Sequence, residues 1–187
     1  MRLSAPRIKP VDLDNLDADQ REVLSPFLAR GGVLNIFRTL ANAPKALASF
    51  LAWGGYILSK RNVLPERDRE LVILRTGFNC KSGYEWTQHV PIGIAAGLTA
   101  EECNRIKAGP DAEGWAERDR AMLRATDDLT RDFFVSEASW KALDFLTDDQ
   151  KMHLVMSVGQ YTQVSMMLNS FGIQLDAGQV LDPDLRA

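Results

Sequence analysis

The sequence is poor in the residues that build metal sites and disulfide frameworks. It contains two cysteines, Cys80 and Cys103, and two histidines among 187 residues. A disulfide framework or a cysteine-based zinc site needs a larger, closely spaced set of such residues. We therefore expect no structural metal. Because neither cysteine has a second one within a helical turn, a dithiol mechanism is excluded as well.

Long hydrophobic runs and a strong excess of one charge are also lacking. No segment approaches the roughly 18 to 20 apolar residues of a membrane span, and the start, MRLSAPRIKPVDLDN, has no apolar signal core. The net charge is −3, with both signs interspersed. This balance gives no basic footprint for nucleic acid and no acidic tail. We expect a cytoplasmic protein without membrane or nucleic-acid partners, whose ligand is a small molecule.

No alternating strand pattern bounded by hairpin signals occurs, whereas helical periodicity recurs throughout, so the fold class is predicted to be all-α. Residues 1–16 hold two prolines and no helical period, which predicts an extended arm on the surface or on a neighbouring subunit. Residues 17–187 are long enough for one helical domain. Eight or nine helices are expected, at about 18–29, 35–43, 44–60, 65–78, 99–108, 115–134, 136–145 and 147–171, with one more after a break at 81–83 that carries Glu85 and His89.

Three of these helices begin with capping-box patterns, at Thr99, Thr147 and Ser82, where a hydroxyl residue precedes Glu or Gln by three positions. The segments LPERDREL-V and LTDDQKMHLV also share a pattern. They indicate a weak internal repeat in which His153 takes the place of Glu70.

A carboxylate, a second carboxylate and a histidine are predicted to converge. Glu70 shares the apolar face of its helix, and Glu85 precedes His89 by four residues, which places both on one face of the next helix. Pro91 cannot donate a backbone hydrogen bond, so a kink or restart beside His89 is expected. Glu70, Glu85 and His89 are the candidate catalytic residues.

Each candidate also has a structural explanation. Glu85 can serve the capping box with Ser82 instead. Glu70 can pair with Arg67 or Arg75 instead of acting in catalysis. A histidine on an apolar helix is more often a packed residue than a catalyst.

The candidate substrate-binding residues are two arginines and three neighbours of Glu85. Arg38 and Arg75 lie in apolar helical segments, where they can bind a carboxylate in bidentate fashion or form structural ion pairs equally well. Tyr84 and Trp86 can line a pocket for a planar ligand together with Ser82, although packing is the default for such aromatics. Cys80 is the candidate residue for a redox role. A lone cysteine near a helix is, however, usually an inert small hydrophobic residue.

The run ERDRELVILRTGFNCKSGYEWTQHVPIGIAAGLTAEE, with NIFRTLANAP upstream, resembles the carboxymuconolactone decarboxylase family and, more distantly, its alkylhydroperoxidase-D-like relatives. The resemblance covers residues 33–108. It implies an all-helical domain that forms a homo-oligomer, a trimer or a multiple of one, and works without a metal or organic cofactor.

In the alkylhydroperoxidase relatives a glutamate, a CxxC pair and a histidine form a proton relay that activates a thiol. On this chain the glutamate corresponds to Glu70 and the histidine to His89, while Ser82 and Glu85 stand at the two cysteine positions. Cys80 is two residues out of register. The decarboxylase branch has an ExxxH element, which Glu85 and His89 match.

The resemblance therefore implies a cofactor-independent lyase acting on a small carboxylated, lactone-type substrate from aromatic-compound degradation. Loss of carbon dioxide leaves electron density on carbon, and this carbon must be protonated by a general acid such as His89. Two alternatives stay open. One is an alkylhydroperoxidase-like oxidoreductase that works through Cys80, and the other is a non-catalytic ligand-binding oligomer.

Overall fold

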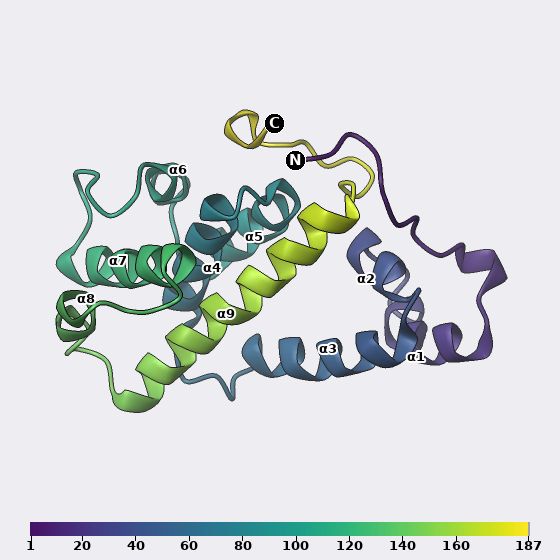
Figure 1. Ribbon diagram of the computed structural model, residues 1–187, viewed down its shortest axis with the longest axis horizontal. Helices are drawn as coiled ribbons and strands as arrows, with labels where there is room; N and C mark the ends of the chain where they lie inside the picture. Colours follow the sequence, from purple (N-terminus) through teal and green to yellow (C-terminus); the bar gives the residue numbers. More distant parts are fainter. Residues whose placement is uncertain (187) are drawn as a thin grey trace.

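The computed structural model describes residues 1–186, and this part of the chain is helical, without a strand (Figure 1). The all-α prediction is confirmed. Two short 3-10 turns, at Leu13–Asn15 and Pro183–Leu185, lie near the ends. The nine helices of the described part are α1 (Ala18–Leu28), α2 (Asn35–Leu40), α3 (Pro44–Ile57), α4 (Glu66–Asn79), α5 (Gly83–Ala95), α6 (Ala100–Ala108), α7 (Glu117–Arg131), α8 (Glu137–Ala142) and α9 (Asp148–Phe171).

The longest helix, α9, runs diagonally through the molecule, with α4 to α8 on one side and α1 to α3 on the other (Figure 1). It begins at a complete capping box of Thr147 and Gln150 and ends at Gly172, which adopts the left-handed conformation with φ 68°. Among residues 1–186, no helix combines the length and apolar character needed to cross a membrane.

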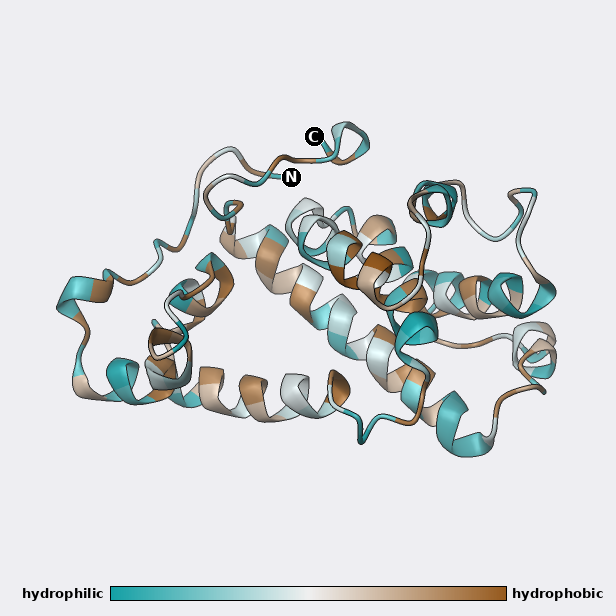
Figure 2. Ribbon diagram, turned by 180° about the vertical axis from the view of Figure 1, so that it is seen from behind, coloured by the Kyte–Doolittle hydropathy of each residue, from teal (hydrophilic) through white to brown (hydrophobic). Residues whose placement is uncertain are grey.

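Helix α4 lies at the centre of the domain, because it packs against α5, α7 and α9. Its residues from Asp68 to Gly77 are all buried. The main core joins α4 to α7 and α9 through fully buried side chains such as Leu71, Met122 and Leu154. The hydropathy colouring of Figure 2 shows apolar segments gathered where these helices face one another.

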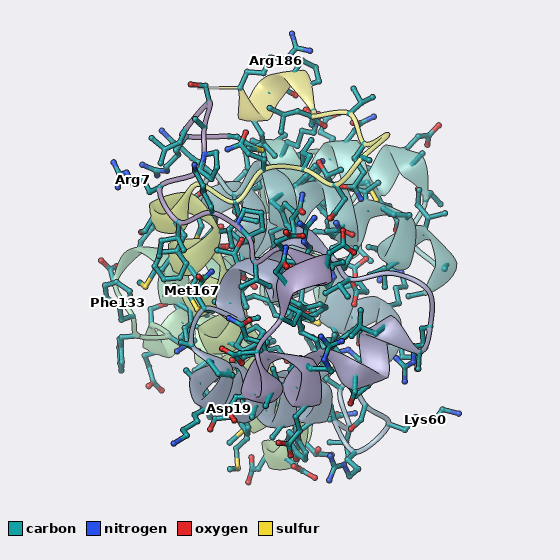
Figure 3. The ribbon with its side chains drawn as sticks, turned by 90° about the vertical axis from the view of Figure 1, so that its right-hand side faces the viewer. Arg7, Asp19, Lys60, Phe133, Met167 and Arg186 are labelled. Carbon is teal, nitrogen blue, oxygen red and sulfur yellow. The ribbon has the colours of Figure 1, made fainter. Side chains whose placement is uncertain are left out.

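The residues before the first helix lie along the surface of their own chain. The Arg7 and Ile8 amides both donate to the Phe171 carbonyl, at 2.8 and 3.2 Å. The segment after α9 ends beside the N-terminus, and the Met1 amino group bonds the Leu185 carbonyl. Figure 3 shows Arg7 and Arg186 projecting at this end of the molecule.

Several expected boundaries differ from the structure. Helix α3 ends at Ile57 instead of Lys60, and turns follow it up to Pro65. Helix α7 spans Glu117–Arg131, shorter than expected at both ends. The short helix α2 has Leu34 at its N-cap instead of Asn35. The capping boxes at Thr99 and Thr147 are confirmed.

Helices α4 and α7 begin with the same four residues, Glu-Arg-Asp-Arg, at positions 66 and 117. Their ion pairs are exchanged: Arg67 bonds both oxygens of Asp119, at 3.0 and 2.9 Å, and Arg118 pairs with Asp68. This repeat differs from the one expected between 64–72 and 146–155. The exchanged ion pairs join the N-terminal turns of α4 and α7, which pack side by side.

Candidate functional site

Glycines bring α4 and α5 close together. A Cβ atom at Gly77 would lie 3.3 Å from the Glu85 side chain, and one at Gly93 would lie 3.1 Å from that of Leu74 and 3.6 Å from the Cβ of Glu70. Larger residues at these positions would push the two helices apart. The glycines therefore allow Glu70 on α4 to face the polar side of α5.

At this contact His89 lies between two carboxylates. Its Nδ1 is 2.7 Å from Glu70 Oε2, and its Nε2 is 3.0 Å from Glu85 Oε1. All three residues are buried, with exposed fractions of 6% for His89, 1% for Glu70 and 4% for Glu85. The predicted convergence is confirmed. The alternative, in which Glu70 pairs with Arg67 or Arg75, does not hold, because both arginines bond other acids.

The two contacts of His89 are not equivalent. The Glu70 contact satisfies hydrogen-bond geometry, whereas the Glu85 contact is a close ionic approach in which Oε1 has no aligned donor among residues 1–186. Glu70 thus orients the imidazole and fixes one ring nitrogen. Glu85 Oε1 is buried and faces Nε2 of His89 without an aligned hydrogen bond.

Electrostatics keep His89 charged. Burial lowers its pKa, but the negative charges of Glu85 and Glu70 and the hydrogen bond to Glu70 outweigh burial and raise the pKa of His89 to about 10. The histidine is therefore an imidazolium at neutral pH. It stores a proton beside two buried carboxylates.

Tyr161 on α9 completes the buried group. Its ring meets that of His89 edge to face, with centroids 4.9 Å apart and an angle of 83°. Burial and then the charges of Glu85 and Glu70 raise the pKa of Tyr161 well above its usual range, so the phenol stays protonated. Tyr161 is a hydrogen-bond donor that the sequence analysis missed. The only sequence signal for it was the buried face of α9.

The predicted capping box at Ser82 is wrong. Ser82 does precede the first residue of α5, but its side chain makes no cap hydrogen bond and its Oγ is buried without a partner. The Ser82 amide already donates to the Gly77 carbonyl at 2.8 Å, so Glu85 is not needed there and turns to His89. The expected restart at Pro91 is also wrong, because α5 continues through it.

The two arginines proposed as substrate anchors are engaged elsewhere. Arg75 forms a bidentate ion pair with Asp127, at 2.6 and 2.8 Å, and donates to the Ile106 carbonyl. Arg38 donates to the Val11 carbonyl at 3.1 Å and so holds the N-terminal segment. The structure favours the structural explanation for both.

The aromatics next to Glu85 are packed. The Tyr84 hydroxyl donates to Asp176 at 2.6 Å, and burial followed by this carboxylate raises the pKa of Tyr84. Trp86 lies against Phe78 with ring centroids 5.7 Å apart. Both side chains belong to core clusters, which agrees with a packing role for these aromatics and not with the lining of a ligand pocket.

Cys80 is half-buried in the wall of an open pocket of about 540 Å³, together with Thr162 and Asn169. Burial raises the pKa of the Cys80 thiol, and hydrogen bonds to Ser165 and Thr162 oppose this only in part. A thiol of this kind is not a ready nucleophile. Among the described residues, no group of three or more His, Cys, Asp or Glu side chains is arranged to hold a metal ion.

The fold is shared with solved structures of the AhpD type. The chain is similar over 92% of its length, with 22% identity and a TM-score of 0.79, to an alkylhydroperoxidase AhpD core, an uncharacterized peroxidase-related protein from Ralstonia eutropha JMP134, of which 93% is covered. A peroxidase-related protein from Silicibacter sp. TM1040 matches with 16% identity and a TM-score of 0.76, over 94% of this chain and 95% of that one.

The debrominase Bmp8, solved with 2,3,4-tribromopyrrole, has the same fold, with 12% identity, a TM-score of 0.75 and coverage of 93% of this chain and 94% of that one. No curated protein matches the chain significantly. The model of the carboxymuconolactone decarboxylase family matches residues 44–128, from the start of α3 into α7. Over these residues the chain is similar to this family, and it lacks a CxxC pair.

Proposed function

We propose that the chain is a cofactor-independent lyase that transfers a proton through Glu70, His89 and Glu85 to a small carboxylated, lactone-type substrate. The observation that supports it is the charged imidazole between two buried carboxylates. Such an arrangement stores one proton in a site closed to bulk water. It suits a reaction that needs a single proton at a defined atom.

Decarboxylation has this requirement. The bond between the substrate carbon and its carboxylate breaks, the electron pair stays on the carbon, and carbon dioxide leaves. A proton from His89, passed directly or through Glu85, then forms the new carbon–hydrogen bond, and solvent later returns a proton to the imidazole. No electrons are exchanged with an acceptor, so the step needs no redox partner.

The experiment is to incubate the protein with small carboxylated lactones and measure carbon dioxide release. Turnover that is present in the wild type and lost in His89→Ala would support the proposal. Folding of the variant is checked by circular dichroism, since alanine is well tolerated within a helix. Turnover that persists in His89→Ala would refute it.

A thiol peroxidase working through Cys80 is the second candidate, and one observation favours it: Cys80 lines an open pocket. The raised thiol pKa speaks against it. Titration of the thiol with an alkylating reagent across pH separates the two. Rapid alkylation at neutral pH and peroxide turnover abolished by Cys80→Ser would favour the peroxidase.

We also propose that the chain forms a homo-oligomer, a trimer or a multiple of one. Large apolar side chains are exposed on several helices, including Trp53 on α3, Ile92 and Ile94 on α5 and Met166 on α9. Apolar surface of this kind is often covered by association. Light scattering at micromolar concentration tests this, and a monomer there would contradict it.

A further inference from the structure

Arg69 on α4 is a buried arginine without an acidic partner. It is 5% exposed, and it directly precedes Glu70. Its Nη1 donates to the Ser59 carbonyl at a long 3.4 Å, and its Nε is buried without any partner. Within residues 1–186, no carboxylate lies within ion-pair distance of its guanidinium.

The other buried or half-buried arginines of α4 are treated differently. Arg67 has Asp119 and Glu102 as partners, and Arg75 has Asp127 and two backbone carbonyls. A guanidinium taken out of water without a counter-charge is unfavourable, so proteins usually pair it. The fold pairs these two arginines and leaves Arg69 without an acidic partner among residues 1–186.

The surroundings of Arg69 supply neutral polar groups. The Ser59 contact places its guanidinium at the end of α3, where Ile57, Ile73 and Tyr161 form a cluster between α3, α4 and α9. The neighbouring Gln160 on α9 has a buried Oε1 without a partner. The charge of Arg69 acts on the Tyr161 hydroxyl and opposes the rise in the pKa of that phenol. Tyr161 packs with Ile57 and Ile73 in this cluster and also contacts the His89 ring.

We propose that Arg69 binds the carboxylate of the substrate, with the Tyr161 hydroxyl as a second donor. A guanidinium matches a carboxylate through two parallel hydrogen bonds, and a protonated phenol adds a third. Because the Tyr161 ring contacts His89, a ligand held in this way lies next to the protonated imidazole of His89. The assignment of this ligand as substrate rests on the proposed function, whereas the binding of a carboxylate does not.

Calorimetric titration with acetate and benzoate tests the site, with acetamide and benzamide as uncharged controls of the same shape. We expect the carboxylates to bind the wild type, and Arg69→Met to weaken them by roughly tenfold to a hundredfold. Arg124→Met is the matched control, since Arg124 is an exposed arginine paired with Asp111, and it should leave binding unchanged. Absence of carboxylate binding to the wild type, equal binding to Arg69→Met, or tighter binding of phosphate would overturn the proposal.

Thermal unfolding separates a binding role from a structural one. If Arg69 is kept for a ligand, Arg69→Met should raise the unfolding temperature of the ligand-free protein, because an unpaired buried charge is removed. The same change at Arg75 should lower it, since Asp127 would lose its partner. Equal losses in both variants would show that Arg69 is structural and refute the proposal.

The outcomes also separate this site from the lyase. Arg69-dependent carboxylate binding in a protein that releases no carbon dioxide would support the site and refute the lyase. Carbon dioxide release with an unchanged KM in Arg69→Met would support the lyase and refute the site.

Discussion

The two histidines share one sequence pattern and have different environments. Each follows an acidic residue by four positions, as Glu85 with His89 and Asp149 with His153. His89 has a buried carboxylate at each ring nitrogen. His153 has the Asp149 carboxylate at 3.0 Å from Nδ1 and the Tyr56 hydroxyl at 2.8 Å from Nε2, and the Asp149 side chain is 63% exposed.

The comparison shows what the helical spacing provides and what it does not. A separation of four residues brings an acid beside the imidazole in both helices. A second acid from another helix, and burial of both acids, occur only at His89. Because water screens the charge of an exposed carboxylate, the two pairs differ in strength despite equal distances.

The largest difference should appear in turnover. His89→Ala should reduce carbon dioxide release by about a hundredfold to ten-thousandfold, the usual contribution of general acid–base catalysis. His153→Ala should leave it unchanged, because His153 bonds Tyr56 and Asp149 instead of the site. Steady-state rates of the two variants provide the measurement. Equal losses would remove the functional distinction between the histidines.

The next difference should appear in stability. Glu70→Ala removes one partner of a buried ionic contact, and we expect the free energy of unfolding to fall by about 3–5 kcal/mol. Asp149→Ala breaks a largely exposed pair and should cost less than about 1 kcal/mol. Urea unfolding of both variants gives the two values. A small loss for Glu70→Ala would mean that the contact is weaker than its burial suggests.

Glu85→Gln should shift the pH dependence of turnover. The change removes one of the charges that raise the pKa of His89, so the imidazole loses its proton at lower pH. The alkaline limb of the rate profile should therefore move downward while the protein stays folded. An unchanged profile with full activity would leave Glu85 as a packing residue.

The last difference concerns the pH dependence of stability. The pKa of His89 is raised from an ordinary value near 6.5 to about 10, so its contribution is complete below pH 6.5 and is lost as the pH rises through about 10. Unfolding temperatures between pH 7 and 10 should fall less in His89→Gln than in the wild type. Parallel curves would contradict the raised pKa.

Sequence reasoning could place Glu70 beside His89 because helical spacing and the family register both apply within thirty residues of chain. It failed at Ser82, where capping depends on whether a backbone amide is already bonded, and the Gly77 carbonyl takes it. It also chose Arg75 over Arg69. The partner of Arg75 is Asp127, 52 residues away, and such long-range pairing is not visible in a local pattern.

The sequence also carries a signal for the contact between α4 and α7. The identical starts of α4 and α7, Glu-Arg-Asp-Arg at 66 and 117, mark the two helices that pack start to start. The expected repeat between 64–72 and 146–155 relates the start of α4 to the start of α9 instead. Helix starts share polar residues for reasons of capping alone, so only the full identity of the four residues distinguished the true pair.

The two exchanged ion pairs fix the position of α4 along the axis of α7. Sliding α4 along α7 by one helical turn, about 5.4 Å, would separate Arg67 from Asp119 and Arg118 from Asp68 together. Glu70 follows Arg67 by one turn on the same helix. The position of Glu70 relative to His89 thus depends on ion pairs that involve neither residue. A shift of α7 along α4 would displace Glu70 from His89.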